Sequence, residues 1–255
     1  MDYKKIEELV LKTKDIIDQT SMVIDTKAPN DYVTNIDLSI STYLKKELKI
    51  LAPEVCFFSE EEAGSLQDNC WILDPIDGTT NLIYGYNLSS VSLAHYLNGE
   101  IVYGIIFNPF TNELFTAEKG KGAWLNHSKQ LFVSSRQLKD SLIEFGAGST
   151  KKEYTEENFE LVKEIFRHCV DIRRICSSAL DLCYIAAGRI DGYFEKVLKP
   201  WDIAAGSLIL EEAGGKITDY NGAPIQFASP TSVIASNSVT HQSLYQIISQ
   251  RGGTK

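Results

Sequence analysis

Two aspartates stand three residues apart at the end of an apolar run, in the stretch "WILDPIDGTTNL" (71–82). The apolar run predicts a strand. Pro75 fixes its own φ and keeps the preceding Asp74 extended. The chain then turns tightly, so the carboxylates of Asp74 and Asp77 and the carbonyl of Ile76 can face one site. Oxygen ligands of this kind suit Mg²⁺, Mn²⁺ or Ca²⁺ rather than zinc.

The residues that follow this pair are suited to binding an anion. Gly78 lets the backbone approach a ligand closely. A helix can begin at Thr79, and the free N–H groups at the start of a helix bind phosphate. Metal ligands and a phosphate-binding segment within six residues together indicate metal-assisted phosphoryl hydrolysis.

Three further acidic stretches lie at the ends of predicted strands or the starts of predicted helices, where α/β folds gather their sites. They are "NDYVTNID" (30–37), "SEEE" (59–62) and "PWD" (200–202). If all four stretches converge, their carboxylates cannot stay ionised without a counter-charge. No cluster of lysines or histidines lies nearby in the sequence, so a divalent cation is the natural solution.

Each stretch also has a purely structural interpretation. The "DPIDG" segment could be a surface turn, and Thr34-x-x-Asp37 matches a helix capping box. Asp202 could cap the helix that follows it. The acidic run 60–62 could be a solvated face, and Glu195 an exposed strand end. The histidines have no metal or triad spacing and are interpreted as structural: His95, His127, His168 and His241.

The composition describes an ordinary globular protein. The 255 residues, 44% hydrophobic and 23% charged, can bury a sizeable core. The net charge of −9 argues against a nucleic-acid groove and against binding to an anionic membrane. A phosphorylated substrate remains compatible with it, because bound cations can invert the local field.

The cysteines and the N-terminus predict a soluble cytoplasmic protein. The five cysteines are odd in number and scattered, and no Cys-x-x-Cys occurs, so buried free thiols are expected. The N-terminus leads into a charged helix without an apolar signal core, and no apolar run approaches transmembrane length.

Hydrophobic periodicity gives the elements that must position the acidic residues. It predicts helices over 4–19 and 34–51, with a loop at 25–32 between them. Strands are predicted at 55–58 and 71–74, and an antiparallel meander over 89–125. The second half alternates predicted helices (159–169, 178–188, 202–215, 240–250) with predicted strands (171–175, 191–195, 216–220, 232–236).

The two halves differ in type. Residues 1–140 are predicted to form an α+β part that carries the metal site. Residues 141–255 are predicted to form an α/β part that carries the substrate-recognition residues. No Pro/Gly/Ser-rich linker separates them, so we expect one compact unit.

Taken together, the acidic stretches resemble the inositol monophosphatase family of Mg-dependent, lithium-sensitive sugar phosphatases. The order and approximate spacing of five blocks fit over nearly the whole chain. The blocks are "DYVTNID" (31–37), "SEE" (59–61), "WILDPIDGTTNL" (71–82), "SALDLCYIAAGRIDGYFE" (178–195) and "PWDIAAG" (200–206). The resemblance implies a layered αβαβα sandwich, usually a homodimer. It also implies hydrolysis of myo-inositol phosphate to inositol and phosphate by metal-activated water.

Carried over by position, the resemblance implies the ligands of two or three Mg²⁺ ions. Glu60, Asp74 and the Ile76 carbonyl would hold the ion that activates water. Asp74, Asp77 and Asp202 would hold the ion that stabilises the leaving oxygen. Mn²⁺ could substitute, whereas Li⁺ and Ca²⁺ are expected to inhibit.

The resemblance also implies roles around the reacting phosphate. Thr79 and Asp37 would orient the attacking water, and Glu61 would support the ligands from behind. The N–H groups of Gly78 and Thr79 would hold the phosphate, with Asp202 also among the substrate contacts.

Three residues match family positions on the side of the sugar or in the mobile loop. Glu195 matches a residue that accepts hydrogen bonds from inositol hydroxyls. Ser177 lies in Cys176-Ser177-Ser178, which aligns with a Gly-Ser/Thr-Ala substrate loop, so Cys176 replaces a usual glycine. Lys27 matches the family's loop lysine. Leu82 replaces a common phenylalanine, which should affect packing alone.

Alternatives to inositol phosphate remain open. Thr80-Asn81 resembles the inositol branch rather than the 3′-phosphoadenosine or histidinol phosphatases. Fructose-1,6-bisphosphatase activity, or a broad sugar-phosphate or nucleotide phosphatase activity, is the enzymatic alternative. A partner protein of the transcription machinery is the alternative that is not an enzyme, and the intact carboxylate set disfavours a purely non-catalytic role.

Overall fold

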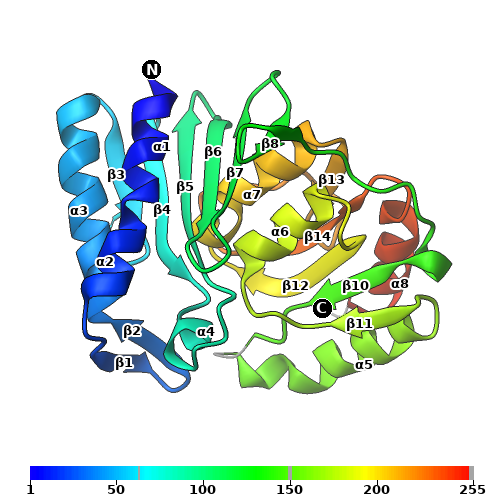
Figure 1. The fold of residues 1–255 in the computed structure, drawn as a ribbon. Coiled ribbons are helices and arrows are strands. Elements are labelled where there is room, and N and C mark those ends of the chain that lie inside the picture. Colours follow the sequence, from blue (N-terminus) through cyan, green and yellow to red (C-terminus); the bar gives the residue numbers. More distant parts are fainter. Residues whose placement is uncertain (63, 149–150, 253–255) are drawn as a thin grey trace.

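The computed structural model describes residues 1–62, 64–148 and 151–252. Two β-sheets stand side by side, and helices lie outside and between them (Figure 1). The order of layers is helices, sheet, helices, sheet, helices. The predicted αβαβα sandwich is therefore confirmed.

The outer helices on the first sheet come from the N-terminus. They are α1 (Tyr3–Leu11), α2 (Thr13–Gln19) and α3 (Asn35–Leu51). The single helix predicted over 4–19 is thus two helices that meet at Lys12. Their apolar faces pack on the sheet in a core that includes Ile6, Val10, Ile40, Leu44, Trp71 and Leu73.

The first sheet has seven strands in the order β3-β4-β5-β6-β7-β8-β9. Only β3 and β4 pair in parallel; the others pair antiparallel, as the predicted meander requires. The strands are β3 (Cys56–Ser59), β4 (Cys70–Asp77), β5 (Ser90–Leu97), β6 (Glu100–Asn108), β7 (Glu113–Glu118), β8 (Ala123–Leu125) and β9 (Lys129–Gln130).

Two helices fill the space between the sheets, α6 (Ser178–Ala186) and α7 (Pro200–Glu212). Both are apolar around nearly their whole circumference, as helices covered on both sides must be. Close approach requires Gly104 on β6, because a Cβ there would lie 2.7 Å from the Ala205 carbonyl oxygen. This middle core joins side chains from both halves of the chain, such as Ile106 and Ile209.

The second sheet has five strands in the order β11-β10-β12-β14-β13. Strand β10 pairs in parallel with β11 and β12, whereas β14 is antiparallel to β12 and β13. Helices α5 (Thr155–Phe166) and α8 (His241–Gly252) form the last layer. The strands are β10 (Leu142–Phe145), β11 (Asp171–Arg173), β12 (Gly192–Leu198), β13 (Gly215–Thr218) and β14 (Thr231–Asn237).

The loop predicted at 25–32 is wrong in part. Strands β1 (Ile24–Ala28) and β2 (Asp31–Thr34) form a separate antiparallel hairpin. Every residue of β1 is exposed, so the strand carries no apolar alternation that could have predicted it.

The expectation of five free thiols is also wrong for two cysteines. A disulfide joins Cys56 on β3 to Cys70 on β4. The two residues are register partners on neighbouring parallel strands, a proximity that their spacing of 14 in the sequence does not reveal. Cys169, Cys176 and Cys183 are free.

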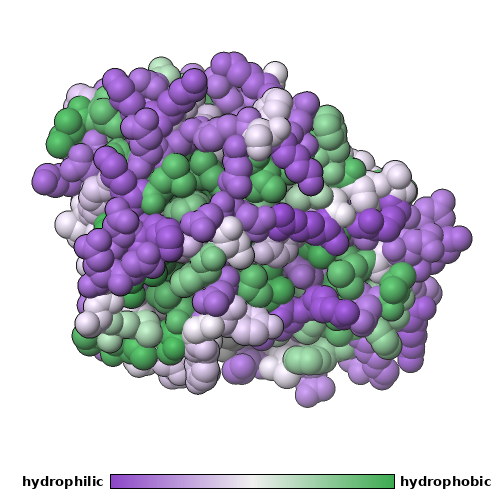
Figure 2. Space-filling view, viewed as in Figure 1, coloured by the Kyte–Doolittle hydropathy of each residue, from purple (hydrophilic) through white to green (hydrophobic). Residues whose placement is uncertain are grey.

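The surface agrees with the ordinary composition. On the face shown in Figure 2, hydrophilic residues are mixed with smaller groups of hydrophobic ones. Within the part of the chain that the structure describes, no helix is long and apolar enough to cross a membrane.

Candidate active site

A bulge in β4 brings the two aspartates of the "DPID" segment together. Residues three apart on a regular strand point to opposite faces of a sheet. Asp74 pairs with Ser92 and Asp77 with Ser90, so β4 has one extra residue here relative to β5. The segment contains Pro75, which cannot donate to the ladder. The bulge places both carboxylates on one side, and both are buried.

Asp202 completes a cluster with these two residues. One carboxylate oxygen from each of Asp74, Asp77 and Asp202 lies within 4.8 Å of the others. Burial, followed by repulsion from Glu60, raises the pKa of Asp74 well above its usual range. Burial, followed by repulsion from Asp77, does the same to the pKa of Asp202.

Asp202 lies in the first turn of α7, because Pro200 begins the helix. The N-cap is Lys199, so the capping interpretation had the wrong position for Asp202. Asp202 accepts the Lys199 N–H at 2.7 Å from inside the helix. Its other carboxylate oxygen stays available to the cluster.

Helix α6 holds Asp77 in place. The carboxylate accepts hydrogen bonds from the Ser177 hydroxyl, the Ser178 hydroxyl at 3.2 Å and the Ala179 N–H at 2.9 Å. Burial still raises the pKa of Asp77 to about 6, although these bonds lower it. The hydroxyl of Ser177, which was predicted to bind substrate, thus donates its hydrogen bond to Asp77 in this structure.

The β1–β2 hairpin brings the predicted loop residue Lys27 to the acidic stretch 59–62. Lys27 Nζ lies 3.2 Å from Glu60 Oε1 and 2.7 Å from Glu61 Oε1. Burial raises the pKa of Glu60 to about 7, although Lys27 lowers it. Burial also raises the pKa of Glu61. The predicted loop lysine therefore contacts the acidic stretch that carries Glu60.

Asp37 combines the two roles weighed for it. It closes the capping box of α3 by accepting the Thr34 N–H at 2.9 Å and the Thr34 hydroxyl at 2.5 Å. Its other oxygen accepts the Thr79 hydroxyl at 3.2 Å. Thr79 Oγ1 also lies 3.0 Å from the Ile76 carbonyl. A helix cap thus fixes the carboxylate that orients Thr79.

Gly78 adopts a conformation that favours glycine, with φ +88°, and precedes the short helix α4 (Thr79–Ile83). A Cβ here would lie 3.0 Å from the Leu88 carbonyl oxygen and 3.1 Å from that of Cys176. Cys176 itself has φ +60°, the left-handed conformation that explains why glycine suits this position.

Two adjoining cavities open at this cluster. The first, of about 290 Å³, is lined by every predicted metal ligand together with Gly78 and Thr79. The second, of about 160 Å³, is lined by Asp77 and Asp202 and extends to Glu195. We call them the metal cavity and the inner cavity.

Glu195 on β12 is held facing the inner cavity. Its carboxylate accepts the Tyr193 hydroxyl at 2.5 Å and the Gly148 N–H at 3.1 Å. Burial raises its pKa, although the bond from Tyr193 lowers it. Glu195 is therefore no exposed strand end, and its carboxylate can accept hydrogen bonds from a ligand.

The structure adds residues that sequence reasoning missed. Arg174 lines both cavities, and among the described lining residues of the two it is the one with a basic side chain. Tyr193, Asp181 and Gly146 also line the inner cavity. Arg174, Asp181 and Tyr193 lie within a predicted strand or helix, where residue type alone predicts a structural role, and no element was predicted around Gly146.

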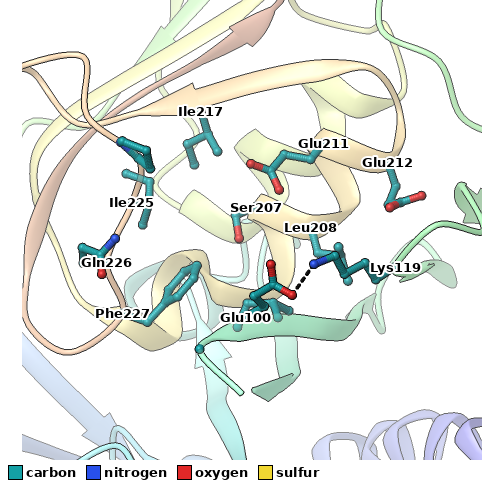
Figure 3. A pocket seen from close by; sticks show the side chains of 13 residues that line it. Glu100, Lys119, Ser207, Leu208, Glu211, Glu212, Ile217, Ile225, Gln226 and Phe227 are labelled. Atoms are coloured by element: carbon teal, nitrogen blue, oxygen red, sulfur yellow. Dashed lines mark hydrogen bonds and ion pairs between the residues drawn. The ribbon is translucent and has the colours of Figure 1, made fainter. Parts of the chain in front are cut away.

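A third cavity, of about 330 Å³, has a larger volume than the metal cavity but lies away from the acidic cluster, so cavity volume alone does not identify the candidate active site. It lies at the other end of α7, against Ser207, Leu208, Glu211 and Glu212 (Figure 3). Its Glu100 is already paired with Lys119. None of its lining residues belongs to the acidic cluster.

The acidic cluster fits a divalent metal ion. Its donors are all oxygen atoms, as Mg²⁺ prefers. Burial raises the pKa of each of the three aspartates, so the charged forms that a cation needs are unfavourable without one. A bound cation removes this penalty.

Comparison with known protein families gives one match over nearly the whole chain. The profile described as the inositol monophosphatase family matches residues 3–252.

Curated relatives carry the name Nus factor SuhB. The Vibrio cholerae protein is 37% identical over 231 residues, which cover 89% of this chain and 86% of the relative. The Escherichia coli K12 protein is 39% identical over 199 residues, which cover 77% of this chain and 74% of the relative.

Solved structures share the fold closely. An IMPase from Thermotoga maritima has a TM-score of 0.90 and 30% identity, with 99% of each chain covered. An IMPase/NADP phosphatase complexed with Mg²⁺ and phosphate has a TM-score of 0.88 and 27% identity, with 96% of this chain and 93% of that chain covered.

Proposed function

The chain belongs to the inositol monophosphatase family, and from this membership we propose that it is a Mg²⁺-dependent phosphatase of small polyol phosphates, with myo-inositol monophosphate as its substrate. The observation that carries the proposal is the cluster of Asp74, Asp77 and Asp202 oxygens within 4.8 Å, beside a cavity that also contains Gly78 and Thr79. Ligands for a metal ion and a segment suited to phosphate share one space.

The metal ligands we propose are Glu60, Asp74, Asp77, Asp202 and the Ile76 carbonyl, all of which line the metal cavity. Mg²⁺ bound there would lower the pKa of water and balance negative charge on the phosphoryl group. Two or three ions per site, replacement by Mn²⁺ and inhibition by Li⁺ and Ca²⁺ are part of the proposal.

Thr79 and Asp37 are proposed to position the attacking water. The Thr79 hydroxyl lies 3.2 Å from Asp37 Oδ1 and 3.0 Å from the Ile76 carbonyl oxygen, and it can donate its one proton to either of them. Its lone pairs are then free to accept a hydrogen bond from water. Asp37 is in turn fixed by Thr34. Glu61 and Lys27 are proposed to hold Glu60 in place, as their contacts at the edge of the site support.

The alcohol part of the substrate is proposed to enter the inner cavity. Glu195 would accept hydrogen bonds from its hydroxyl groups there. Ser177 would act through Asp77, to which its hydroxyl donates. Gly78 and Thr79 N–H groups would hold the phosphate in the metal cavity. The leaving oxygen would then lie near Asp77 and Asp202, the acidic residues that line both cavities.

A panel of phosphate esters tests the substrate. Initial rates of phosphate release with Mg²⁺ should be compared for myo-inositol 1-phosphate, fructose 1,6-bisphosphate, NADP⁺ and 4-nitrophenyl phosphate. The proposal expects the highest kcat/KM for myo-inositol 1-phosphate. A higher kcat/KM for any other ester would refute that assignment, and no release from any of them would refute the phosphatase.

Arg174 favours a second candidate, the fructose-bisphosphatase activity. A substrate with two phosphate groups presents an anion away from the reacting phosphate, and Arg174 is a cation at the junction of the two cavities. Arg174→Gln should then lower kcat/KM for fructose 1,6-bisphosphate more than for myo-inositol 1-phosphate. An equal loss would remove the support for this candidate.

The name Nus factor carried by the curated relatives supports a third candidate, a partner of the transcription machinery. Co-purification of the chain with RNA polymerase, repeated with Asp74→Asn, tests this role separately from catalysis. The expected homodimer and cytoplasmic location remain predictions, and light scattering of the purified chain tests the former.

A further inference from the structure

Asp181 lines the inner cavity, yet nothing in the proposed chemistry uses it. It lies in the first turn of α6, and 2% of the residue is exposed. Its Oδ1 atom is buried and accepts no hydrogen bond from the described residues. A buried oxygen without a partner is destabilising, and such atoms are rare in native proteins.

Glu144 on β10 is the neighbour of Asp181. It is equally buried, with 3% exposed, and does not line the inner cavity. Glu144 Oε2 is likewise buried without a partner among the described residues. The two carboxyl groups lie close enough to form a hydrogen bond once one of them holds a proton. Burial, followed by this bond, raises the pKa of Asp181 well above its usual range.

A metal ion is a poor occupant for this pair. The described residues whose oxygen atoms could surround an ion are Asp74, Asp77 and Asp202, and Asp181 is not among them. Because the proton of the pair lies between the two acids, Asp181 has no second proton to donate, but it keeps an oxygen that can accept a hydrogen bond from an alcohol hydroxyl. The shared proton leaves the pair with one negative charge instead of two, which reduces its repulsion of a substrate phosphate.

We propose that Asp181 is a specificity-determining residue that binds a hydroxyl group of the substrate's alcohol part at the wall of the inner cavity. The proposal rests on the proposed function and adds a second hydroxyl-binding group beside Glu195. Glu144 is a positioning residue, since it reaches the cavity only through Asp181.

Two substitutions of Asp181 separate this role from a structural one. Asp181→Ala removes both hydrogen-bonding atoms, whereas Asp181→Asn keeps an uncharged group of the same size. The measured quantity is the ratio of kcat/KM for myo-inositol 1-phosphate to kcat/KM for 4-nitrophenyl phosphate, which has no hydroxyl groups. Asp181→Ala should lower this ratio about tenfold to a hundredfold, mainly through KM, and Asp181→Asn should restore most of it.

A ratio that stays within about twofold of wild type in Asp181→Ala would overturn the proposal, because loss of fold lowers both substrates together. Glu211→Gln in the remote cavity of Figure 3 is the matched control, since it also removes the acid group of a cavity-lining residue on one of the two helices between the sheets. Its ratio should equal that of wild type. If Asp181→Ala does not fold, Asp181→Leu keeps the volume and serves in its place.

Measurements of ligand binding test the role of Asp181 independently of whether the protein is a phosphatase. If wild type hydrolyses no ester, the phosphatase has failed, and calorimetric titration then decides about Asp181. Selective loss of affinity for myo-inositol 1-phosphate relative to inorganic phosphate in Asp181→Ala, restored in Asp181→Asn, would support the hydroxyl contact. Equal affinities, or no binding of myo-inositol 1-phosphate by wild type, would refute it.

Discussion

Gly146→Ala should displace the carboxylate of Glu195 while leaving the chemical structure of that side chain unchanged. Gly146 follows β10 directly, and a Cβ at this position would meet both carboxylate oxygens of Glu195 closer than 3.0 Å. Real Cβ atoms are almost never so close to another atom. Glu195 must therefore move, and the bonds from Tyr193 and Gly148 that fix it must stretch or break.

The expected magnitude follows from what Glu195 would lose. A hydrogen bond to a charged group contributes about 1.5–3 kcal/mol, which corresponds to roughly ten- to a hundredfold in kcat/KM for a polyol phosphate. Overpacking of a filled site costs about 1–3 kcal/mol of stability, so the variant should fold with a lowered Tm. Hydrolysis of an aryl phosphate should fall much less, because that substrate has no hydroxyl groups to lose.

The assay is kcat/KM for both substrates, with Tm from calorimetry. Gly64→Ala is the matched control, because a Cβ there would meet nothing within 4 Å. Glu195→Gln should reproduce the substrate ratio of Gly146→Ala. An unchanged ratio in Gly146→Ala, or an equal loss for both substrates, would refute the assignment of Glu195 to the alcohol part.

Further predictions concern the water, the proton balance and the fold. Thr79→Ala should lower kcat by a similar factor for every ester, because all share the attacking water; a selective loss in steady-state assays would contradict it. Glu60, with a pKa of about 7, and Asp77, with a pKa of about 6, stabilise the metal-free fold at low pH and lose this contribution as pH rises through those values. The increase in Tm on adding Mg²⁺ should therefore be larger at about pH 8 than at about pH 5, and an increase independent of pH would count against these residues as ligands. Asp191 is fully buried and accepts hydrogen bonds from Ser134, Arg136 and the Leu142 N–H. Asp191→Ala should cost about 3 kcal/mol or more in chemical unfolding, and a loss below about 1 kcal/mol would show that this network matters little.

The sequence predicted the elements that carry strong periodicity or turn residues. Helix α3, the antiparallel meander and the alternation of helices and strands after residue 155 all lie where the apolar pattern placed them. The pattern failed at β1, where exposure removes the alternation that marks a strand. The pattern also predicted α1 and α2 as one helix, because the apolar positions continue at helical spacing on both sides of Lys12, where the two helices meet.

The site could be predicted as far as residue type and spacing reach. "DPID" supplied two carboxylates, and the family resemblance supplied Glu60 and Asp202 as their neighbours. The bulge that turns Asp74 and Asp77 to one side is a property of the pairing with β5. The contact of Lys27 with Glu60, 33 residues away, depends on where the hairpin docks. Neither can be seen in one strand alone.

Asp181 and Glu144 show a second limit. Each lies at an ordinary position in its element, in the first turn of a helix and in the middle of a short strand. Only the packing of α6 against the second sheet makes the two acids buried neighbours beside a cavity. Single-sequence patterns describe one element at a time and do not report such proximity.

The metal dependence of hydrolysis tests the central claim most directly. Phosphate release from myo-inositol 1-phosphate should be measured against Mg²⁺ concentration, before and after chelation, in wild type and in Asp74→Asn. We predict that activity saturates with Mg²⁺ and disappears with EDTA. We predict also that Asp74→Asn loses at least about a hundredfold in kcat, because it removes a ligand that faces both Glu60 and Asp202. Full activity after exhaustive chelation, or a loss below about tenfold in Asp74→Asn, would contradict a metal-dependent phosphatase at this cluster.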